Sequence, residues 1–190
     1  MTVAASAVAA DMQSNSGSAA REAAAAAFRK ALVSSASWRM ERTLPGSDRT
    51  FVSSGTVDCR VGGSGIEWRT MEPFRSLVAM RKDSIVFEDE DGRREKTAAE
   101  TPCYADIRKV ADAFASGDTD AIEAMFDEES AMLPGGRWRI VLKPRVPAMR
   151  TLVKSVEMTG RELPDTVVMM GGNGSASSIS FKAAKNGDAR

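Results

Sequence analysis

The stretch from Ser18 to Val33 has the pattern of one amphipathic helix. It is rich in alanine, it contains neither Gly nor Pro, and Ala24, Phe28 and Leu32 follow one another at a spacing of four. Residues four apart lie on the same side of a helix, and the hydroxyl of Ser18 can accept a backbone N–H of the first turn. The pattern therefore predicts a helix over 18–33 with a narrow apolar stripe.

Beyond this helix the apolar residues recur at every second position, which is typical of strands. Trp38 and Met40 alternate with charged residues, a turn occupies 44–48, and the strand pattern resumes at Phe51. Further strands are predicted at 65–70, 75–80, 84–88, 95–98, 138–142, 152–158, 166–170 and 177–181, and helices at 105–115 and 118–126.

Consecutive strands joined by short turns favour an antiparallel meander over a β-α-β arrangement. The dipeptide Asp91-Gly92 is a strong signal for one of the hairpins. Regular strand spacing over most of the chain predicts a strongly curved sheet, an incomplete β-barrel (half-barrel) of the α+β class, mainly antiparallel β. The few helices are then expected to cover its concave face. We expect a single domain over 18–184. A curved sheet with helices on its concave face is suited to enclosing an apolar molecule.

The first residues of the chain are small and apolar. Ala7-Val8-Ala9 fits a signal-peptide cleavage site, although the basic region that precedes such a site is missing. We interpret 1–17 as the remnant of a signal peptide, with a disordered alanine-rich leader as the alternative, and 185–190 as a disordered tail.

The two cysteines, Cys59 and Cys103, are far apart and lack the spacing of a redox or zinc motif. In an oxidising compartment we expect them to form a disulfide. Two unpaired thiols are the alternative. The sequence contains no run of 18 apolar residues, so we expect no membrane-spanning segment.

The amino-acid composition makes several classes of function less favoured. Lys and Arg total 26 and Asp and Glu total 26, so no net charge draws the chain to nucleic acid. The sequence contains no histidine, which removes the commonest general base and most catalytic zinc arrangements. These features favour a protein that binds over one that catalyses, and we expect no cofactor, no metal and no catalytic residue.

Several short motifs resemble sites without meeting their requirements. The acidic run 88–92 lacks the ligand spacing of a calcium loop, and we interpret it as a solvated hairpin tip. The glycine-rich run 62–65 precedes a strand, whereas a phosphate-binding loop opens a helix. The run 171–174 is likewise interpreted as a turn, and the acidic run 127–129 as a solubilising flank.

Methionine is frequent and tyrosine is rare, with 11 Met and 1 Tyr. Flexible thioethers can adapt to ligands of varied shape, but they also fill ordinary cores. A cavity and a filled core predict the same residues and differ only in whether the volume is occupied. The methionines on predicted strands or helices are Met40, Met80, Met125, Met158, Met169 and Met170.

The order of these elements resembles the periplasmic outer-membrane lipoprotein carriers, the LolA family, and the chain looks like a divergent member. The resemblance covers roughly residues 19–184. It rests on Gly55-Thr56-Val57, Gly65-Ile66-Glu67-Trp68, Pro73-Phe74, Asp91-Gly92, the run Trp138 to Pro144, and Ile179-Ser180-Phe181.

The resemblance implies a half-open curved sheet whose concave face shields the acyl chains of a lipoprotein, or a related lipid-like cargo, during transfer from the inner to the outer membrane. Alternation assigns the cavity lining to Ile66, Trp68, Met80, Phe87, Trp138, Ile140, Leu142 and Met158. The lid is assigned to Phe114, Ile122, Met125 and Phe126. The resemblance further implies a monomeric, non-enzymatic periplasmic protein with an inner-membrane transporter as donor and an outer-membrane acceptor.

The chain departs from the family pattern at Gly62-Gly63, where the well-studied carriers have an Arg-Pro pair whose Arg holds the lid closed. Ile66 stands where an aromatic residue is usual. A specialised lipid or polymer pathway is therefore an alternative to lipoprotein transport. Two other functions stay open: a carboxylate-dependent hydrolase, which needs paired carboxylates in the concavity, and a structural or adaptor protein with a filled barrel.

Overall fold

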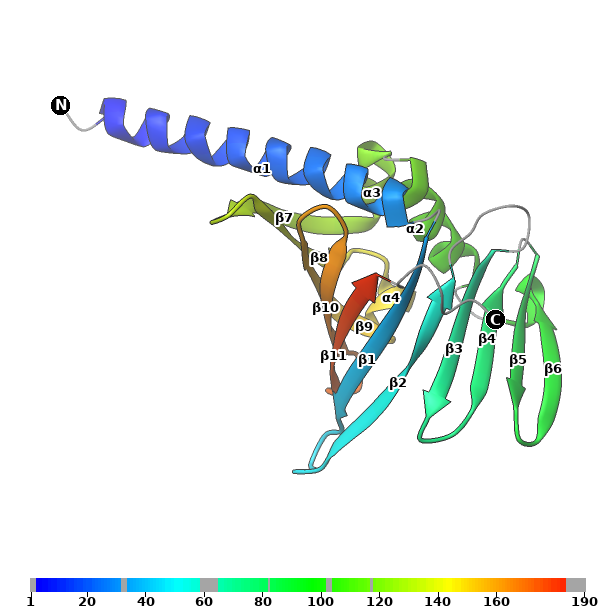
Figure 1. The fold of residues 1–190 in the computed structure, drawn as a ribbon. Coiled ribbons are helices and arrows are strands. Elements are labelled where there is room, and N and C mark those ends of the chain that lie inside the picture. The colour runs from blue at the N-terminus through cyan, green and yellow to red at the C-terminus, as the bar shows by residue number, and fades with distance from the viewer. Residues whose placement is uncertain are drawn as a thin grey trace.

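A computed structural model describes residues 3–31, 34–58, 65–81, 83–101, 104–116 and 118–183 of the chain. These residues form one eleven-stranded antiparallel sheet that curves beneath a group of helices (Figure 1). The prediction of a curved, open antiparallel sheet of the α+β class is confirmed.

The strands are β1 Ser35–Thr43, β2 Thr50–Asp58, β3 Ile66–Glu72, β4 Ser76–Met80, β5 Ser84–Asp89, β6 Gly92–Thr97, β7 Phe126–Leu133, β8 Arg137–Pro144, β9 Val153–Gly160, β10 Pro164–Gly171 and β11 Ala176–Ala183. The helices are α1 Val3–Ala31, α2 Tyr104–Ser116, α3 Thr119–Met125 and α4 Pro147–Arg150, with a 3-10 turn η1 at Ala98–Glu100.

Across the sheet the strands follow the order β6-β5-β4-β3-β2-β1-β11-β10-β9-β8-β7. The first six strands form a meander that runs from the centre to one edge, and the last five form a second meander that returns from the other edge. The two meanders meet where β1 pairs with β11, with Trp38 opposite Phe181. Because β6 and β7 are the two edges and α2 and α3 connect them, the sheet is an incomplete barrel.

One face of this sheet can be followed from strand to strand, because residues paired in register point to the same side. Ile140 of β8 lies opposite Met158 of β9, and both pack against the helices. The register continues through Val167 of β10 and Ile179 of β11 to Met40 of β1. We call this side of the sheet the inner face.

The C-terminal part of α1 lies on the inner face of β7, β8 and β10, while its N-terminal part extends beyond the sheet (Figure 1). Ala20, Ala24 and Ala27 form the stripe that packs there, with exposed fractions of 0%, 1% and 2%. Such small side chains allow the helix backbone to approach the sheet closely. Phe28 adds a tilted aromatic contact with Trp138, with ring centroids 5.9 Å apart.

Trp138 is the largest fully buried side chain of this core, with an exposed fraction of 0%. Its indole N–H donates a hydrogen bond to the carbonyl oxygen of Arg161 at 2.9 Å. Gly160 lies directly opposite in β9, and a Cβ atom there would come within 2.5 Å of the Trp138 Cζ2 atom. Glycine at this position therefore leaves the room that the indole ring occupies.

The strand β7 was not predicted, because 127–129 was interpreted as a flank of the preceding helix. The structure places these acidic residues within an edge strand, and the helix α3 ends one residue before Phe126. Lys143 pairs with Glu129 at 2.7 Å and Arg145 pairs with Asp127 at 2.7 Å. Charged side chains are common on edge strands, where they discourage further strand pairing. The acidic residues that kept β7 from being predicted as a strand are therefore typical of a strand at the edge of a sheet.

The boundaries of other elements also differ from the prediction. The helix predicted to begin at Ser18 already runs from Val3, and the short helix α4 was not predicted. Whether 1–17 belongs to an export signal stays a prediction. Within the described ranges, none of the helices combines the length and the apolar character needed to cross a bilayer.

The alanine stripe of α1 leads to a first testable prediction. Replacing Ala24 with Leu adds bulk to a closely packed contact, and we expect a loss of about 1–3 kcal/mol in the free energy of unfolding. Replacing the exposed Ala26 with Leu keeps a similar helix propensity and should change it by less than about 0.5 kcal/mol. Urea unfolding followed by tryptophan fluorescence measures both. Equal effects of the two substitutions would show that α1 does not pack as described.

Candidate functional site

The inner face extends across the other half of the sheet. Val57 of β2 lies opposite Trp68 of β3, which lies opposite Val78 of β4 and then Phe87 of β5. The residues predicted to line a cavity therefore share this one face: Ile66, Trp68, Met80, Phe87, Trp138, Ile140, Leu142 and Met158. Their placement follows from the register, and their role as a cargo lining stays a prediction.

These residues occupy two different environments. Trp138, Ile140, Leu142 and Met158 have exposed fractions of 0%, 4%, 2% and 6% and pack against α1. We call the inner face of β7, β8 and β9 the covered part. Its described side chains pack against one another as a core.

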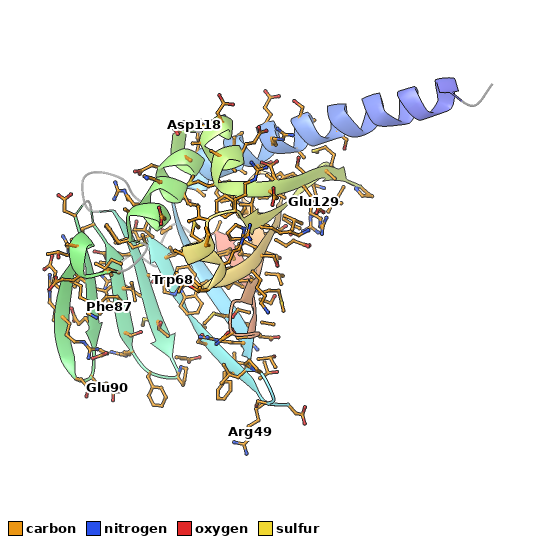
Figure 2. The ribbon with its side chains drawn as sticks, turned by 180° about the vertical axis from the view of Figure 1, so that it is seen from behind. Arg49, Trp68, Phe87, Glu90, Asp118 and Glu129 are labelled. Carbon is orange, nitrogen blue, oxygen red and sulfur yellow. The ribbon has the colours of Figure 1, made fainter. Side chains whose placement is uncertain are left out.

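The inner face of β1–β5 and β11 forms the open part. The remaining predicted lining residues, Ile66, Trp68, Met80 and Phe87, are each only partly buried there. Figure 2 shows Trp68 and Phe87 on the strands that lie away from the long helix. The two parts share the same apolar character, and the main contacts of α1 with the sheet are with β7, β8 and β10.

Aromatic side chains form the centre of the open part. Trp38 stacks on Trp68 with ring centroids 4.6 Å apart and an angle of 27° between the planes. Phe181 meets Trp68 edge-on, with centroids 6.1 Å apart. Trp38, Val57 and Ile179 are buried, and the side chains packed around them are Ala36, Met40, Ile66, Trp68, Val167, Met169 and Phe181.

The candidate lining prediction missed several members of this cluster. Trp38, Val57, Val78, Ile179 and Phe181 lie on the inner face but were not among the residues assigned to the lining. The alternation within each strand was the available signal. It identifies the face of a single strand, but it does not say which strands lie next to one another.

Of the residues predicted to form a lid, Ile122, Met125 and Phe126 belong to the same core as the covered part, and their role as a lid stays a prediction. Ile122 and Phe126 have exposed fractions of 7% and 3%, and Met125 packs against them in the same core. The carboxylate of Asp118 accepts the backbone N–H of Ala121 and so caps α3. The side chain of Phe114 lies outside the described residues.

One buried polar atom in the open part lacks a partner. Trp38 has an exposed fraction of 3%, and no described residue accepts a hydrogen bond from its indole Nε1. The other buried polar side-chain atoms without a hydrogen bond in the described structure belong to Arg81, Glu128 and Arg137. The guanidinium of Arg137 bonds Asp165 through another nitrogen, and Glu128 has Arg21 at 3.1 Å.

The ionisable groups with shifted pKa include an ion pair on the outer face of β8 and β9. Arg139 donates to Glu157 at 2.7 Å, and this hydrogen bond lowers the pKa of Glu157 and raises the pKa of Arg139. A bond from Lys143 likewise lowers the pKa of Glu129. Within the described part of the chain, no group of three acidic, histidine or cysteine residues is placed to hold a metal ion.

A hollow of about 390 Å³ lies near the turn between β3 and β4, and its lining includes the outer-face residues Arg69, Leu77 and Glu88 as well as Thr70, Ser76 and Asp89 of the other alternation. Arg69 and Arg75 line it on one side and Glu88 and Glu90 on the other, with Leu77 between them. Its walls carry charges of both signs. The predicted disulfide of Cys59 and Cys103, and the run Gly62-Gly63, lie outside the described residues.

Neither a protein-family model nor a curated protein sequence matches this chain. Several solved structures are similar to it in fold. One is a LolA superfamily protein from Nitrosomonas europaea. It is 10% identical, with a TM-score of 0.46, and the alignment covers 88% of this chain and 91% of that one. This is the superfamily that the order of elements in the sequence resembles.

Two further structures show the same degree of similarity. The complex of MucA and MucB from Pseudomonas aeruginosa is 13% identical with a TM-score of 0.45, covering 85% of this chain and 55% of that one. LprF from Mycobacterium bovis is 9% identical with a TM-score of 0.41, covering 86% and 91%. Such similarities concern general architecture alone, so the function has to be argued from this chain's own residues.

The Arg139–Glu157 pair leads to a prediction about pH. The folded pKa of Glu157 is lowered, so its contribution to stability is present above the unfolded pKa and is lost as the pH falls through the folded one. Both side chains are more than a third exposed, at 37% and 38%, so we expect Glu157→Gln to cost less than about 1 kcal/mol at pH 7. The difference in the free energy of unfolding between Glu157→Gln and the unmodified protein should become smaller as the pH falls from about 5 to about 3.

Urea unfolding across this pH range is the measurement. Arg139→Gln removes the same bond and should give a similar loss at pH 7, and the double substitution should cost less than the sum of the two single ones. A difference that stays constant with pH, or strict additivity, would show that the pair does not interact as described.

Proposed function

We propose that the protein is a non-enzymatic carrier that shields acyl chains of lipoproteins, or of a related lipid-like cargo, on the open part of its inner face. One observation carries this proposal. The inner face is apolar in both halves of the sheet, yet α1 packs on the covered part, while Trp68, Met80 and Phe87 of the open part stay partly exposed. An exposed apolar surface of this kind favours binding to an apolar partner.

The chemistry of the open part suits a hydrocarbon chain. Each methylene transferred from water to an apolar surface contributes about 0.8 kcal/mol, so even a partly shielded acyl chain gains several such increments. Met40, Met80 and Met169 lie on this part of the face or beside it. Their flexible thioethers can adapt to cargo of different shapes.

The carrier role implies a route and partners. We propose that the protein works in the periplasm as a monomer, taking cargo from an inner-membrane transporter and giving it to an outer-membrane acceptor. The balanced charge of 26 basic and 26 acidic residues supports a shuttle that is not held at one charged surface.

A hydrolase has less support. Glu128 lies on the inner face, paired in register with Leu142, and only 7% of its side chain is exposed. Arg21 of α1 lies 3.1 Å from its carboxylate and neutralises it. A buried carboxylate held by a cation in this way favours a structural role in fixing α1 on the sheet.

Two adjacent residues of β4 provide a matched test. Val78 and Leu77 are both partly buried, but Val78 lies on the inner face and Leu77 borders the hollow on the outer face. We expect Val78→Glu to weaken binding of a fluorescent fatty-acid probe at least tenfold, because a charge within an apolar site must be desolvated. Leu77→Glu should change the affinity by less than about twofold, since it lies outside the open part.

Fluorescence titration measures both affinities, and circular dichroism confirms that both variants are folded. Native mass spectrometry of protein purified from cells should also show a lipid-sized adduct. If Leu77→Glu abolishes binding and Val78→Glu does not, the site is the outer hollow and the proposal is wrong. The absence of any probe binding together with a clean unliganded mass would also overturn it.

A further inference from the structure

We propose that the indole N–H of Trp38 is the hydrogen-bond donor for the carbonyl oxygen at the head of a bound acyl chain. This inference rests on the proposed carrier function and specifies its ligand. It predicts that the open part distinguishes an acyl chain, which carries a carbonyl group, from a plain alkyl chain of the same length.

The first observation is the unpaired state of a buried donor. Nearly all buried polar groups in native proteins have a hydrogen-bond partner, and the exceptions need an explanation. Trp38 is 97% buried, given its exposed fraction of 3%, and no described residue accepts from its Nε1. Water cannot readily replace the missing acceptor inside an apolar cluster, so the site favours a ligand that brings an oxygen atom with it.

The second observation is the contrast with Trp138. Both tryptophans lie on the inner face, and both are buried. In the covered part, the N–H of Trp138 bonds the carbonyl oxygen of Arg161 at 2.9 Å. Among the described residues, the indole donor in the covered part therefore has an acceptor, and the one in the open part has none.

The third observation is that the side chains packed around Trp38 are themselves partly exposed. Trp68, Phe181 and Met40 pack against it, and each is partly exposed. An acyl chain that displaces part of this layer would gain contact with the aromatic rings and bring its head group to the indole. The carbonyl oxygen of an acyl chain can accept the hydrogen bond from the indole N–H, whereas an alkyl chain contains no acceptor.

A matched pair of ligands tests the inference. Lauroyl lysophosphatidylcholine and its dodecyl ether analogue have the same head group and nearly the same chain, but only the first has a carbonyl oxygen. We expect the unmodified protein to bind the acyl form about five- to tenfold more tightly, which is the effect of one hydrogen bond. Free laurate, as a third ligand, separates an ester carbonyl from a carboxylate as the source of the oxygen.

Two variants separate the N–H from the aromatic ring. Trp38→Phe keeps an aromatic side chain but removes the donor, and it should bind both lipids with equal affinity. Trp68→Phe makes the same change in the stacked partner and should retain the five- to tenfold preference, whatever it does to the absolute affinities. Retention of the preference by Trp38→Phe would overturn the inference.

The three tryptophans also allow a direct readout by nitrogen-15 NMR. The indole N–H signal of Trp38 should shift on addition of the acyl lipid and much less with the ether, while the Trp138 signal should stay in place because its donor is already bonded. Equal binding of both lipids with no shift of the Trp38 signal would refute the inference and leave the carrier function standing. Binding of neither lipid would count against the carrier function itself.

Discussion

The burial of Trp138 between α1 and the sheet is the contact on which the rest of this structure depends. Its ring occupies the space that Gly160 leaves free, its N–H is satisfied by Arg161, and Phe28 of α1 packs against it. The alanine stripe then holds the helix on β7, β8 and β10. Since one helix cannot span a sheet of eleven strands, fixing α1 on β7, β8 and β10 leaves the strands at the other edge with little or no contact from this helix in the described residues.

This division separates a packed core from the surface that we propose binds cargo, although both belong to one apolar face. In the covered part the volume is occupied by the protein's own side chains, which stabilises the fold. In the open part, residues such as Trp68, Met80 and Phe87 stay partly exposed to solvent, and exposing apolar surface to water costs free energy. Of the two possibilities that the methionine-rich pattern left open, the covered part is a packed core, and the open part is the face that we propose binds cargo.

Much of the fold could be predicted from the sequence, and the reasons are local. Alternation in segments such as the one containing Trp138 and Ile140 reveals a strand and its buried side, and a spacing of four reveals the stripe containing Ala24 and Phe28. The strand β7 was missed because Asp127, Glu128 and Glu129 obscure its alternation. The difference in burial between Trp68 and Trp138 could not be predicted. It depends on which strands α1 packs against, and α1 and these strands are remote from each other in the sequence.

The pairing of β1 with β11 has a consequence for how the protein matures. The strand β1, which follows α1 in the sequence, pairs with β11 in the middle of the sheet. Trp38 and Phe181 therefore become neighbours only after the chain has been synthesised as far as β11. Contacts this distant in sequence form slowly, because a long loop must close before they contribute. The aromatic cluster around Trp38 spans this seam. A chain in which β1 and β11 have not yet paired therefore lacks the aromatic cluster on which the proposed cargo would bind.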